Sequence, residues 1–262
     1  MYCYNSSPAI SNGTIVGNTA SATGGGMYNY SGSGNPRVVN CTFSGNSAPT
    51  GAGLGSFYGS PSLANCVLWA NSGLLIYHTG GTPDLSYCDV QGGWTGMGNI
   101  KLDPKFVRNP SPGPDGVWGT LDDDYGDLRL QAGSPCIDAG NNAAAVAAGL
   151  LTDLDGHLRF FDDPATPDCR WAPGTCGTPP IVDMSAYEFI PVIPGDFDRD
   201  GDVDLADLAA FQACFSGPGA AYTGDCAKAD LNVDGAVDMN DFGIFQRCFS
   251  GVGKPVNPDC AK

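Results

Sequence analysis

The chain has 262 residues, with 28 acidic and 12 basic side chains and a formal net charge of −16. So few cations on an acidic chain argue against nucleic acid and anionic membranes as partners, and no apolar run approaches a transmembrane length. The charge is unevenly placed, because Arg37 is the single charged side chain between Met1 and Pro83. The 11 cysteines indicate an oxidising, extracellular location.

No signal peptide is visible, which conflicts with an extracellular location. The internal repeats offer an explanation, because Met27-Tyr28 aligns with Met1-Tyr2 one repeat earlier. We therefore expect the sequence to begin inside a repeat, as part of a longer secreted protein.

A proline-aligned repeat occupies the N-terminal part of the chain, with steps of 28, 25 and 22 residues between Pro8, Pro36, Pro61 and Pro83. Such a period predicts a solenoid. Two apolar positions recur in each copy. They are Ile10, Val38, Leu63 and Leu85 at the first position, and Ile15, Phe43, Leu68 and Val90 at the second.

In each copy, the alternation of inward-facing residues shifts once by one position. In the second copy this shift falls between residues 38 and 41, which places a bend at Asn40. Short strands separated by corners and stacked in register predict a mainly β chain, a right-handed parallel β-helix. Side-chain amides of successive turns would bond one another. The expected ladders are Asn12, Asn40 and Asn65, and Asn18, Asn46 and Asn71. We expect Cys41, Cys66 and Cys88 to form an interior column of small buried hydrophobes.

The repeats stop after Val107, and three phrases follow: Gly133-Ser-Pro-Cys-Ile-Asp138, Asp153-Leu-Asp-Gly-His-Leu-Arg159 and Val182-Asp-Met-Ser-Ala-Tyr-Glu188. They resemble the end piece of bacterial surface β-helix proteins related to the pectin-lyase-like superfamily, over about residues 8–189. An irregular cap of this kind covers the open edge of a solenoid. We expect a structural charge cluster of Asp138, Asp155, Arg159 and Glu188, and a local Cys169–Cys176 disulfide. For the acidic loop 115–124 we favour a solvated turn over a third calcium site.

Two twelve-residue segments, 196–207 and 230–241, recur at a spacing of 34 residues. Each has oxygen side chains at positions 1, 3, 5, 9 and 12 and glycine at position 6, as a calcium loop requires. The alternative, a solvated acidic surface, would reproduce this register twice only by chance. Predicted for the first ion are Asp196, Asp198, Asp200 and Asp207, with the carbonyl of Asp202 and with Asp204 directly or through water. Predicted for the second ion are Asp230, Asn232, Asp234 and Asp241, with the carbonyl of Ala236 and with Asp238.

The segments before the two loops, 191–195 and 217–224, contain glycine and proline that prevent an entering helix. Only exit helices are expected, with apolar faces formed by Leu208, Phe211 and Phe215, and by Phe242, Phe245 and Phe249. Loop and helix repeated twice, with Asp at position 12, resemble a dockerin domain over residues 195–262. The resemblance implies calcium-dependent binding to a cohesin-like domain. In many type I dockerins a Ser/Thr pair at positions 10 and 11 contacts cohesin; the residues here are Leu205-Ala206 and Met239-Asn240.

Four cysteines follow the same 34-residue repeat, with Cys214 and Cys226 recurring as Cys248 and Cys260. Their symmetry and the small size of the domain favour a disulfide within each repeat. The sequence leaves the other two pairings open.

The sequence thus predicts β-helix rungs in residues 1–110, a cap in 111–190, a linker in 191–194 and a dockerin-like domain in 195–262. We expect a secreted or cell-surface, noncatalytic protein that binds two calcium ions and a cohesin-like partner, with polysaccharide as a second partner and no membrane insertion. The alternative is part of a polysaccharide lyase or glycoside hydrolase acting on plant or algal polysaccharide. Glycosidases need two carboxylates across one bond, yet residues 1–83 contain no Asp, Glu or Lys.

A few charged residues remain near the last rungs. They are Asp84, Asp89, Lys101 and Asp103. We see no pairing among them, and we expect the two histidines, His78 and His157, to lie in loops. No catalytic residue is therefore predicted.

Overall fold

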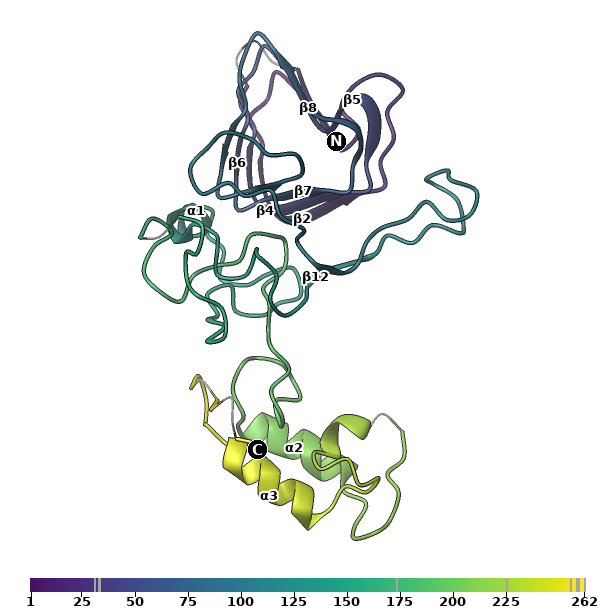
Figure 1. Ribbon diagram of the computed structural model, residues 1–262, viewed down its shortest axis with the longest axis vertical. Helices are drawn as coiled ribbons and strands as arrows, with labels where there is room; N and C mark the ends of the chain where they lie inside the picture. The colour runs from purple at the N-terminus through teal and green to yellow at the C-terminus, as the bar shows by residue number, and fades with distance from the viewer. Residues whose placement is uncertain are drawn as a thin grey trace. The chain divides into compact units, whose positions relative to one another are not determined.

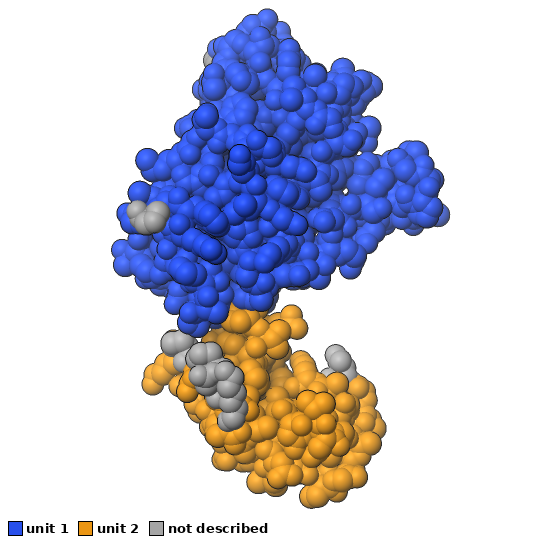
Figure 2. All heavy atoms as spheres, in the orientation of Figure 1, with its two compact units in different colours: residues 1–189 blue, residues 190–262 orange. Residues whose placement is uncertain are grey.

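The computed structural model describes residues 1–30, 32, 34–172, 174–224, 226–254, 256–257 and 260–261. The chain divides into two compact units (Figure 2). Residues 1–189 form the solenoid unit, and residues 190–262 form the C-terminal unit.

Two parallel sheets build the turns of the solenoid unit (Figure 1). The first has the order β1-β3-β5-β8, with strands Tyr2–Tyr4, Met27–Tyr30, Ser47–Phe57 and Ser72–Thr79. The second contains β2 (Ala9–Val16), β4 (Arg37–Ser44), β6 (Ser62–Ala64), β7 (Val67–Trp69), β9 (Asp84–Ser86) and β10 (Asp89–Val90). Each strand pairs in parallel with a strand of the next repeat. The mainly β chain therefore contains a β-solenoid of about three turns, as predicted.

The registers predicted from the prolines are confirmed. One column of paired residues runs Ile10, Val38, Leu63 and Leu85, and the other runs Ile15, Phe43, Leu68 and Val90. These side chains pack into one interior cluster together with Cys41, Cys66 and Cys88. The three cysteines are buried and free, so they act as small hydrophobes, as predicted.

The bend in each turn lies where the parity shift placed it. Asn12, Asn40 and Asn65 have φ of 48°, 50° and 55°, in the left-handed region that asparagine tolerates. The second amide ladder is confirmed, because the Nδ2 atoms of Asn18 and Asn46 each donate to the next Oδ1 at 2.9 Å.

The first amide ladder is only partly formed. Asn65 Nδ2 donates to Asn40 Oδ1 at 3.0 Å, whereas Asn12 turns to the cap. Its Nδ2 donates to the Thr152 carbonyl at 2.6 Å, and its Oδ1 accepts from Arg159 at 2.8 Å. Asn40 Nδ2, which would donate to Asn12 in the ladder, donates instead to the Asp183 and Ser185 carbonyls at 2.9 and 3.2 Å. Hydrogen bonds to the cap therefore replace this rung of the predicted ladder.

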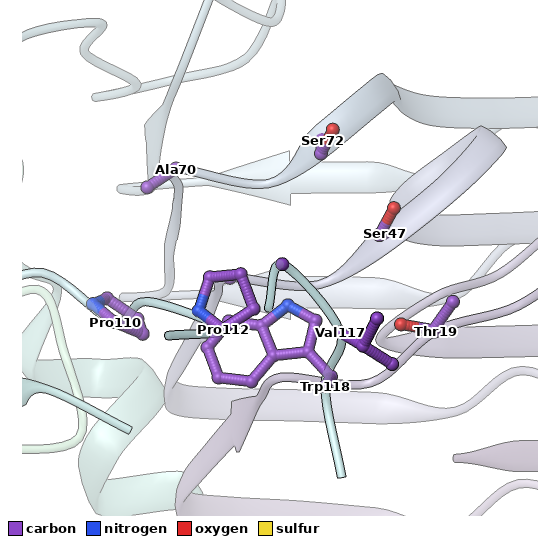
Figure 3. A pocket seen from close by; sticks show the side chains of 10 residues that line it. Thr19, Ser47, Ala70, Ser72, Pro110, Pro112, Val117 and Trp118 are labelled. Atoms are coloured by element: carbon purple, nitrogen blue, oxygen red, sulfur yellow. The ribbon is translucent and has the colours of Figure 1, made fainter. Parts of the chain in front are cut away.

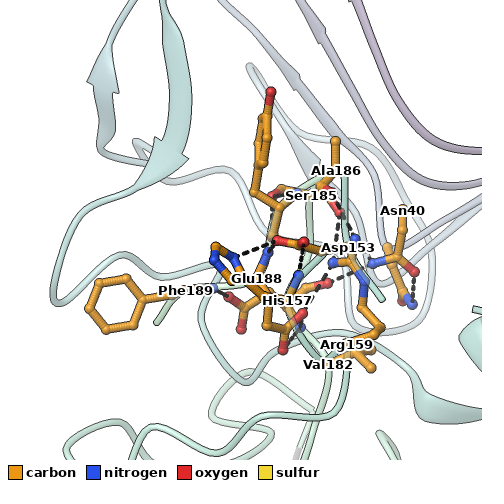
Figure 4. Close-up of polar contacts among 12 residues, drawn as sticks. Asn40, Asp153, His157, Arg159, Val182, Ser185, Ala186, Glu188 and Phe189 are labelled. Atoms are coloured by element: carbon orange, nitrogen blue, oxygen red, sulfur yellow. Dashed lines mark hydrogen bonds and ion pairs between the residues drawn. The ribbon is translucent and has the colours of Figure 1, made fainter. Parts of the chain in front are cut away.

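Strand β11 (Phe106–Arg108), at the end of the predicted rungs, pairs antiparallel with β12 (Asp127–Leu130) of the cap, which also contains the short helix α1 (Asn142–Ala147). Arg159 is fully buried and pairs with Glu188 at 3.1 Å (Figure 4). The predicted charge cluster is confirmed for this pair and wrong for Asp155, which instead pairs with Arg129 at 2.7 Å. The Cys169–Cys176 disulfide is present.

The C-terminal unit contains α2 (Leu205–Cys214), a 3-10 turn η1 (Ala227–Ala229) and α3 (Met239–Cys248) (Figure 1). Phe211 and Phe245 are buried between the helices, with ring centroids 5.5 Å apart. Disulfides join Cys214 to Cys226 and Cys248 to Cys260, which resolves the pairing in favour of the symmetric arrangement.

Candidate metal centre

Both acidic loops lead directly into a helix, and the helix N-terminus orients two of the aspartates. Asp204 caps α2 by accepting from the Ala206 amide at 2.7 Å, and Asp207 accepts from the Asp204 amide at 2.9 Å. Asp238 and Asp241 repeat this capping box at α3. Positions 9 and 12 of each loop are therefore held in place by backbone hydrogen bonds. Sequence reasoning assigned these aspartates to the ion alone and missed their capping role, although Asp-x-x-Asp before an apolar run signals it.

The first aspartate of each loop lies inside the turn. Asp196 Oδ2 accepts from the Gly201 amide at 3.1 Å, and Asp230 Oδ2 accepts from the Gly235 amide at 2.8 Å. The two glycines have φ of 95° and 90°, a conformation that a side chain would strain. The loop backbone thus wraps around the position-1 carboxylate, as predicted for glycine at position 6.

Carboxylate oxygens of several loop residues converge to within 4.8 Å of one another. The converging groups are Asp196, Asp198 and Asp207; Asp202, Asp204 and Asp207; and Asp230, Asp234 and Asp241. Asp207 belongs to both groups of the first loop. It also receives the Phe197 amide at 2.6 Å, which fixes the carboxylate at the centre of the loop.

The remaining predicted ligands also lie within the loops and make local hydrogen bonds there. Asp200 Oδ1 accepts from the Asp202 amide at 3.2 Å and is outside the converging groups. Asn232 Nδ2 donates to Asp234 Oδ2 at 2.9 Å. Ala236 is buried and its amide donates to Asp234 Oδ1 at 3.0 Å.

Electrostatics at the first loop favour a cation. Burial raises the pKa of Asp196 to about 6, and the charges of Asp207 and Asp200 add to this shift. Burial also raises the pKa of Asp198 and of Asp202, again with neighbouring carboxylates contributing. Desolvated like charges repel unless a positive charge lies between them.

The arrangement fits a hard divalent cation. Asp196 Oδ1 and Asp202 Oδ1 are buried and have no hydrogen-bond partner among the described residues. A buried, unpartnered carboxylate oxygen is costly, and a calcium ion accepts six to eight such oxygens. An ion bound here would neutralise the repulsion within the first loop.

Two serines connect the repeats, because each follows the helix of one repeat and hydrogen-bonds the loop of the other; we call this crosswise bracing. They were not identified from the sequence. Ser216, which follows α2, accepts from the Val237 amide of the second loop at 2.9 Å. Ser250, which follows α3, accepts from the Val203 amide of the first loop at 3.1 Å. Each serine also donates its own amide to the carbonyl of the valine from which it accepts: Ser216 to Val237 and Ser250 to Val203, both at 2.9 Å. The recurring Phe-Ser-Gly after each helix was the available signal.

This geometry agrees with a comparison against known families. Residues 194–249 match the family model of the dockerin type I domain. This segment is a dockerin type I domain. Dockerin domains bind calcium and attach to cohesin domains. The comparisons with curated proteins and with solved structures gave no match. Within the described ranges, no helix has both the length and the apolar character needed to cross a membrane.

The solenoid unit, which precedes the dockerin domain, has a pocket beside the Trp118 loop (Figure 3). The Trp118 ring lies over the turns at Gly17 and Gly45, where a Cβ atom would approach it to 2.7 and 3.0 Å. The pocket lining contains serine, threonine, proline and tryptophan but no ionisable side chain. It offers a contact surface and no acid–base pair.

The prediction that both histidines lie in loops is wrong for His78. This residue lies in β8, and its Nδ1 is 2.7 Å from the Gly81 carbonyl. His157 lies in the cap, where its amide donates to Asp153 Oδ1 at 2.9 Å.

The first sheet carries two rows of exposed and half-buried aromatic rings. Tyr2 stacks on Tyr28 at 5.5 Å, and Tyr4 stacks on Tyr30 at 5.7 Å with 7° between the ring planes. Phe57 continues the second row at 6.4 Å from Tyr30. Parallel register sets this spacing, because equivalent residues of successive turns lie side by side.

Proposed function

We propose that the dockerin domain holds two calcium ions and attaches this chain to a cohesin. The observation that carries the proposal is the equivalence of the two loops. Each has a buried position-1 aspartate within the turn, and each has its position-12 aspartate fixed by the following helix. The proposed ligands are those named from the sequence for each loop.

The proposed partner surface lies where the two helices begin. Leu205 and Met239, at position 10 of the loops, are 68% and 63% exposed. Large exposed apolar side chains are typical of protein interfaces. We therefore expect a cohesin with an apolar contact surface, in place of one that recognises a Ser/Thr pair.

The test is binding of the full chain to a panel of cohesin domains, in calcium and in chelator. We expect binding in calcium alone, its loss in Asp196→Asn/Asp230→Asn, and weaker binding with unchanged calcium uptake in Leu205→Ala/Met239→Ala. Asp122→Asn/Asp123→Asn in the solenoid unit is the charge-matched control. Binding that persists in chelator, or no binding to any cohesin, would contradict the proposal.

We also propose that the chain is secreted or displayed at a cell surface and that the solenoid is noncatalytic. Dockerin modules occur in extracellular or cell-surface proteins, and three disulfides fit an oxidising compartment. The rival function is a polysaccharide lyase or glycoside hydrolase. Release of products from plant or algal polysaccharides, abolished by Asp84→Asn or Asp103→Asn, would support that rival.

The aromatic rows favour a polysaccharide as a second partner. Tyr2 and Tyr4 are 64% and 57% exposed, and the surrounding repeats carry a single charge, Arg37. Exposed tyrosine rings, which are rigid and carry hydroxyl groups, suit contact with an uncharged sugar. Affinity electrophoresis in neutral and acidic polysaccharides tests this. We expect retardation in a neutral glycan that Tyr4→Ala/Tyr30→Ala removes and that Tyr222→Ala in the dockerin domain preserves.

A further inference from the structure

A carboxylate in the cap of the solenoid is buried without a compensating charge. Asp138 is 1% exposed. Its Oδ2 accepts from the Asp163 amide at 3.3 Å, whereas its Oδ1 has no hydrogen-bond partner among the described residues. An ionised carboxylate in this state is costly unless a cation lies against it.

Two further carboxylates point to the same place. Oxygens of Asp138, Asp162 and Asp168 lie within 4.8 Å of one another. Asp162 and Asp168 are exposed, so the group has one buried member, Asp138, and two members that solvent can reach. In the described part of the chain, no hydrogen bond or ion pair engages either of these two side chains. Among the described residues, no side-chain contact therefore neutralises these two carboxylates.

The segment carrying them is folded around Asp138. Besides the Asp163 amide, the Cys169 amide donates to the Asp138 carbonyl at 2.8 Å, and the Cys169–Cys176 disulfide anchors the far end. Asp163 stabilises the turn between Asp162 and Asp168 by accepting from the Thr166 hydroxyl at 2.7 Å. The loop that carries Asp162 and Asp168 is thus held against Asp138 by backbone hydrogen bonds.

Among the described residues, no basic side chain forms an ion pair with this group. Arg159, the buried cation of the cap, pairs with Glu188 at 3.1 Å. Arg170 lies over the Trp171 ring at 5.0 Å and makes no ion pair in the described ranges.

A second acidic group of the cap, formed by Asp153, Asp155 and His157, serves as a contrast. Asp153 Oδ1 accepts from the Asp155 and His157 amides at 2.9 Å, and Oδ2 accepts from the Glu188 amide at 2.9 Å. Its two oxygens are therefore satisfied by the backbone, unlike Oδ1 of Asp138.

We propose that Asp138, Asp162 and Asp168 form a third cation site, which takes a hard divalent ion of the calcium class. Carboxylate oxygens are the ligands that such ions prefer, and water completes a shell of six to eight oxygens when the protein supplies only part of it. The ion would tie the exposed 162–168 loop to the buried floor of the cap. This site is independent of the dockerin loops and of the proposed function.

Terbium luminescence separates this site from the dockerin sites. All four tryptophans lie in residues 1–189, and none in the dockerin domain. Trp171 follows Asp168 by three residues, and its Nε1 donates to the Pro135 carbonyl at 3.1 Å. Terbium bound to the full chain and excited through tryptophan should therefore luminesce from the cap site, and added calcium should quench the signal.

Two variants test the assignment without disturbing the core. Asp162→Asn/Asp168→Asn should lose the tryptophan-sensitised signal and bind one calcium ion fewer per chain by equilibrium dialysis. Trp171→Phe should lose the signal and keep the ion count, and Asp84→Asn, an exposed aspartate, should keep both. An unchanged ion count and signal in the double variant, with circular dichroism showing a folded chain, would refute the site and leave Asp138 as a buried protonated acid.

Discussion

The crosswise bracing of the dockerin loops predicts that a serine in one repeat controls the calcium site of the other. Replacing Ser216 with alanine removes the acceptor of the Val237 amide. Val237 is fully buried, so its N–H group would be left without a partner. The affected residue lies at position 8 of the second loop, between the proposed ligands Ala236 and Asp238. Ser216 itself follows the helix of the first loop.

The magnitude follows from the cost of an unsatisfied buried donor, about 1–3 kcal/mol. Because the backbone bond from the Ser216 amide to the Val237 carbonyl remains, we expect the lower half of that range. A loss near 1.4 kcal/mol weakens calcium binding at the second loop roughly tenfold. Ser250→Ala should produce the same loss at the first loop, because Ser250 accepts from the Val203 amide.

Calorimetric calcium titration of the full chain measures this effect when one loop is disabled. In an Asp207→Ala background, which reports on the second loop, Ser216→Ala should weaken binding and Ser250→Ala should not. In an Asp241→Ala background the order should reverse. Ser216→Thr keeps a hydroxyl and is the control. If each serine instead affected the loop of its own repeat, the bracing would have no energetic role.

Three further predictions concern stability. Arg159→Met breaks the buried pair with Glu188 and should destabilise the solenoid unit by about 3–5 kcal/mol, whereas Arg129→Met, at an exposed pair, should cost at most about 1 kcal/mol in thermal unfolding. Phe245→Ala should cost the dockerin domain about 3–5 kcal/mol in urea unfolding; a near-zero loss would contradict its place in the core. Burial raises the pKa of Asp89 to about 7, and its neighbours are the Cys136 thiol, 3.4 Å away, and the charge of Asp103. Between about pH 4 and 7 the folded state therefore holds a proton on Asp89 that the unfolded chain releases. The stability that this proton contributes is complete below about pH 4 and is lost as the pH rises to 7, by about 4 kcal/mol at most. Asp89→Asn should reduce the pH slope of stability by this contribution at constant calcium concentration, whereas buried Asp183, whose pKa is also raised to about 7, keeps its own. An unchanged slope would refute the prediction.

The turns of the solenoid were predictable because the same local rule repeats. Ile10, Val38 and Leu63 occupy equivalent positions after a proline, and parallel stacking converts that equivalence directly into strand register. The calcium loops were predictable for a similar reason. Ligand residues lie within twelve positions of one another, so sequence spacing fixes their geometry.

Contacts between distant segments were not predictable from spacing. The rung between Asn12 and Asn40 is missing because both side chains bond the cap, which lies far along the chain. Asp155 pairs with Arg129 for the same kind of reason. To predict the hydrogen bond between Ser216 and the second loop, one must know how the two loop–helix repeats face one another in the dockerin domain. A recurring Phe-Ser-Gly shows that the serine is equivalent in both repeats, but not which loop it contacts.

The two units respond differently to calcium removal because their stability has different sources. The turns of the solenoid rest on apolar columns and amide ladders, and residues 1–83 hold no acidic side chain. The first dockerin loop instead places six aspartates within twelve residues, with Arg199 as its one cation. Without an ion these carboxylates repel one another around a small core. Chelation should therefore abolish the helical circular dichroism of α2 and α3 and spare the β signal of the turns. In the cap, only the 162–168 loop should loosen, which hydrogen exchange would detect. Simultaneous loss of the helical and β signals would show that calcium stabilises the turns as well, contrary to this reasoning.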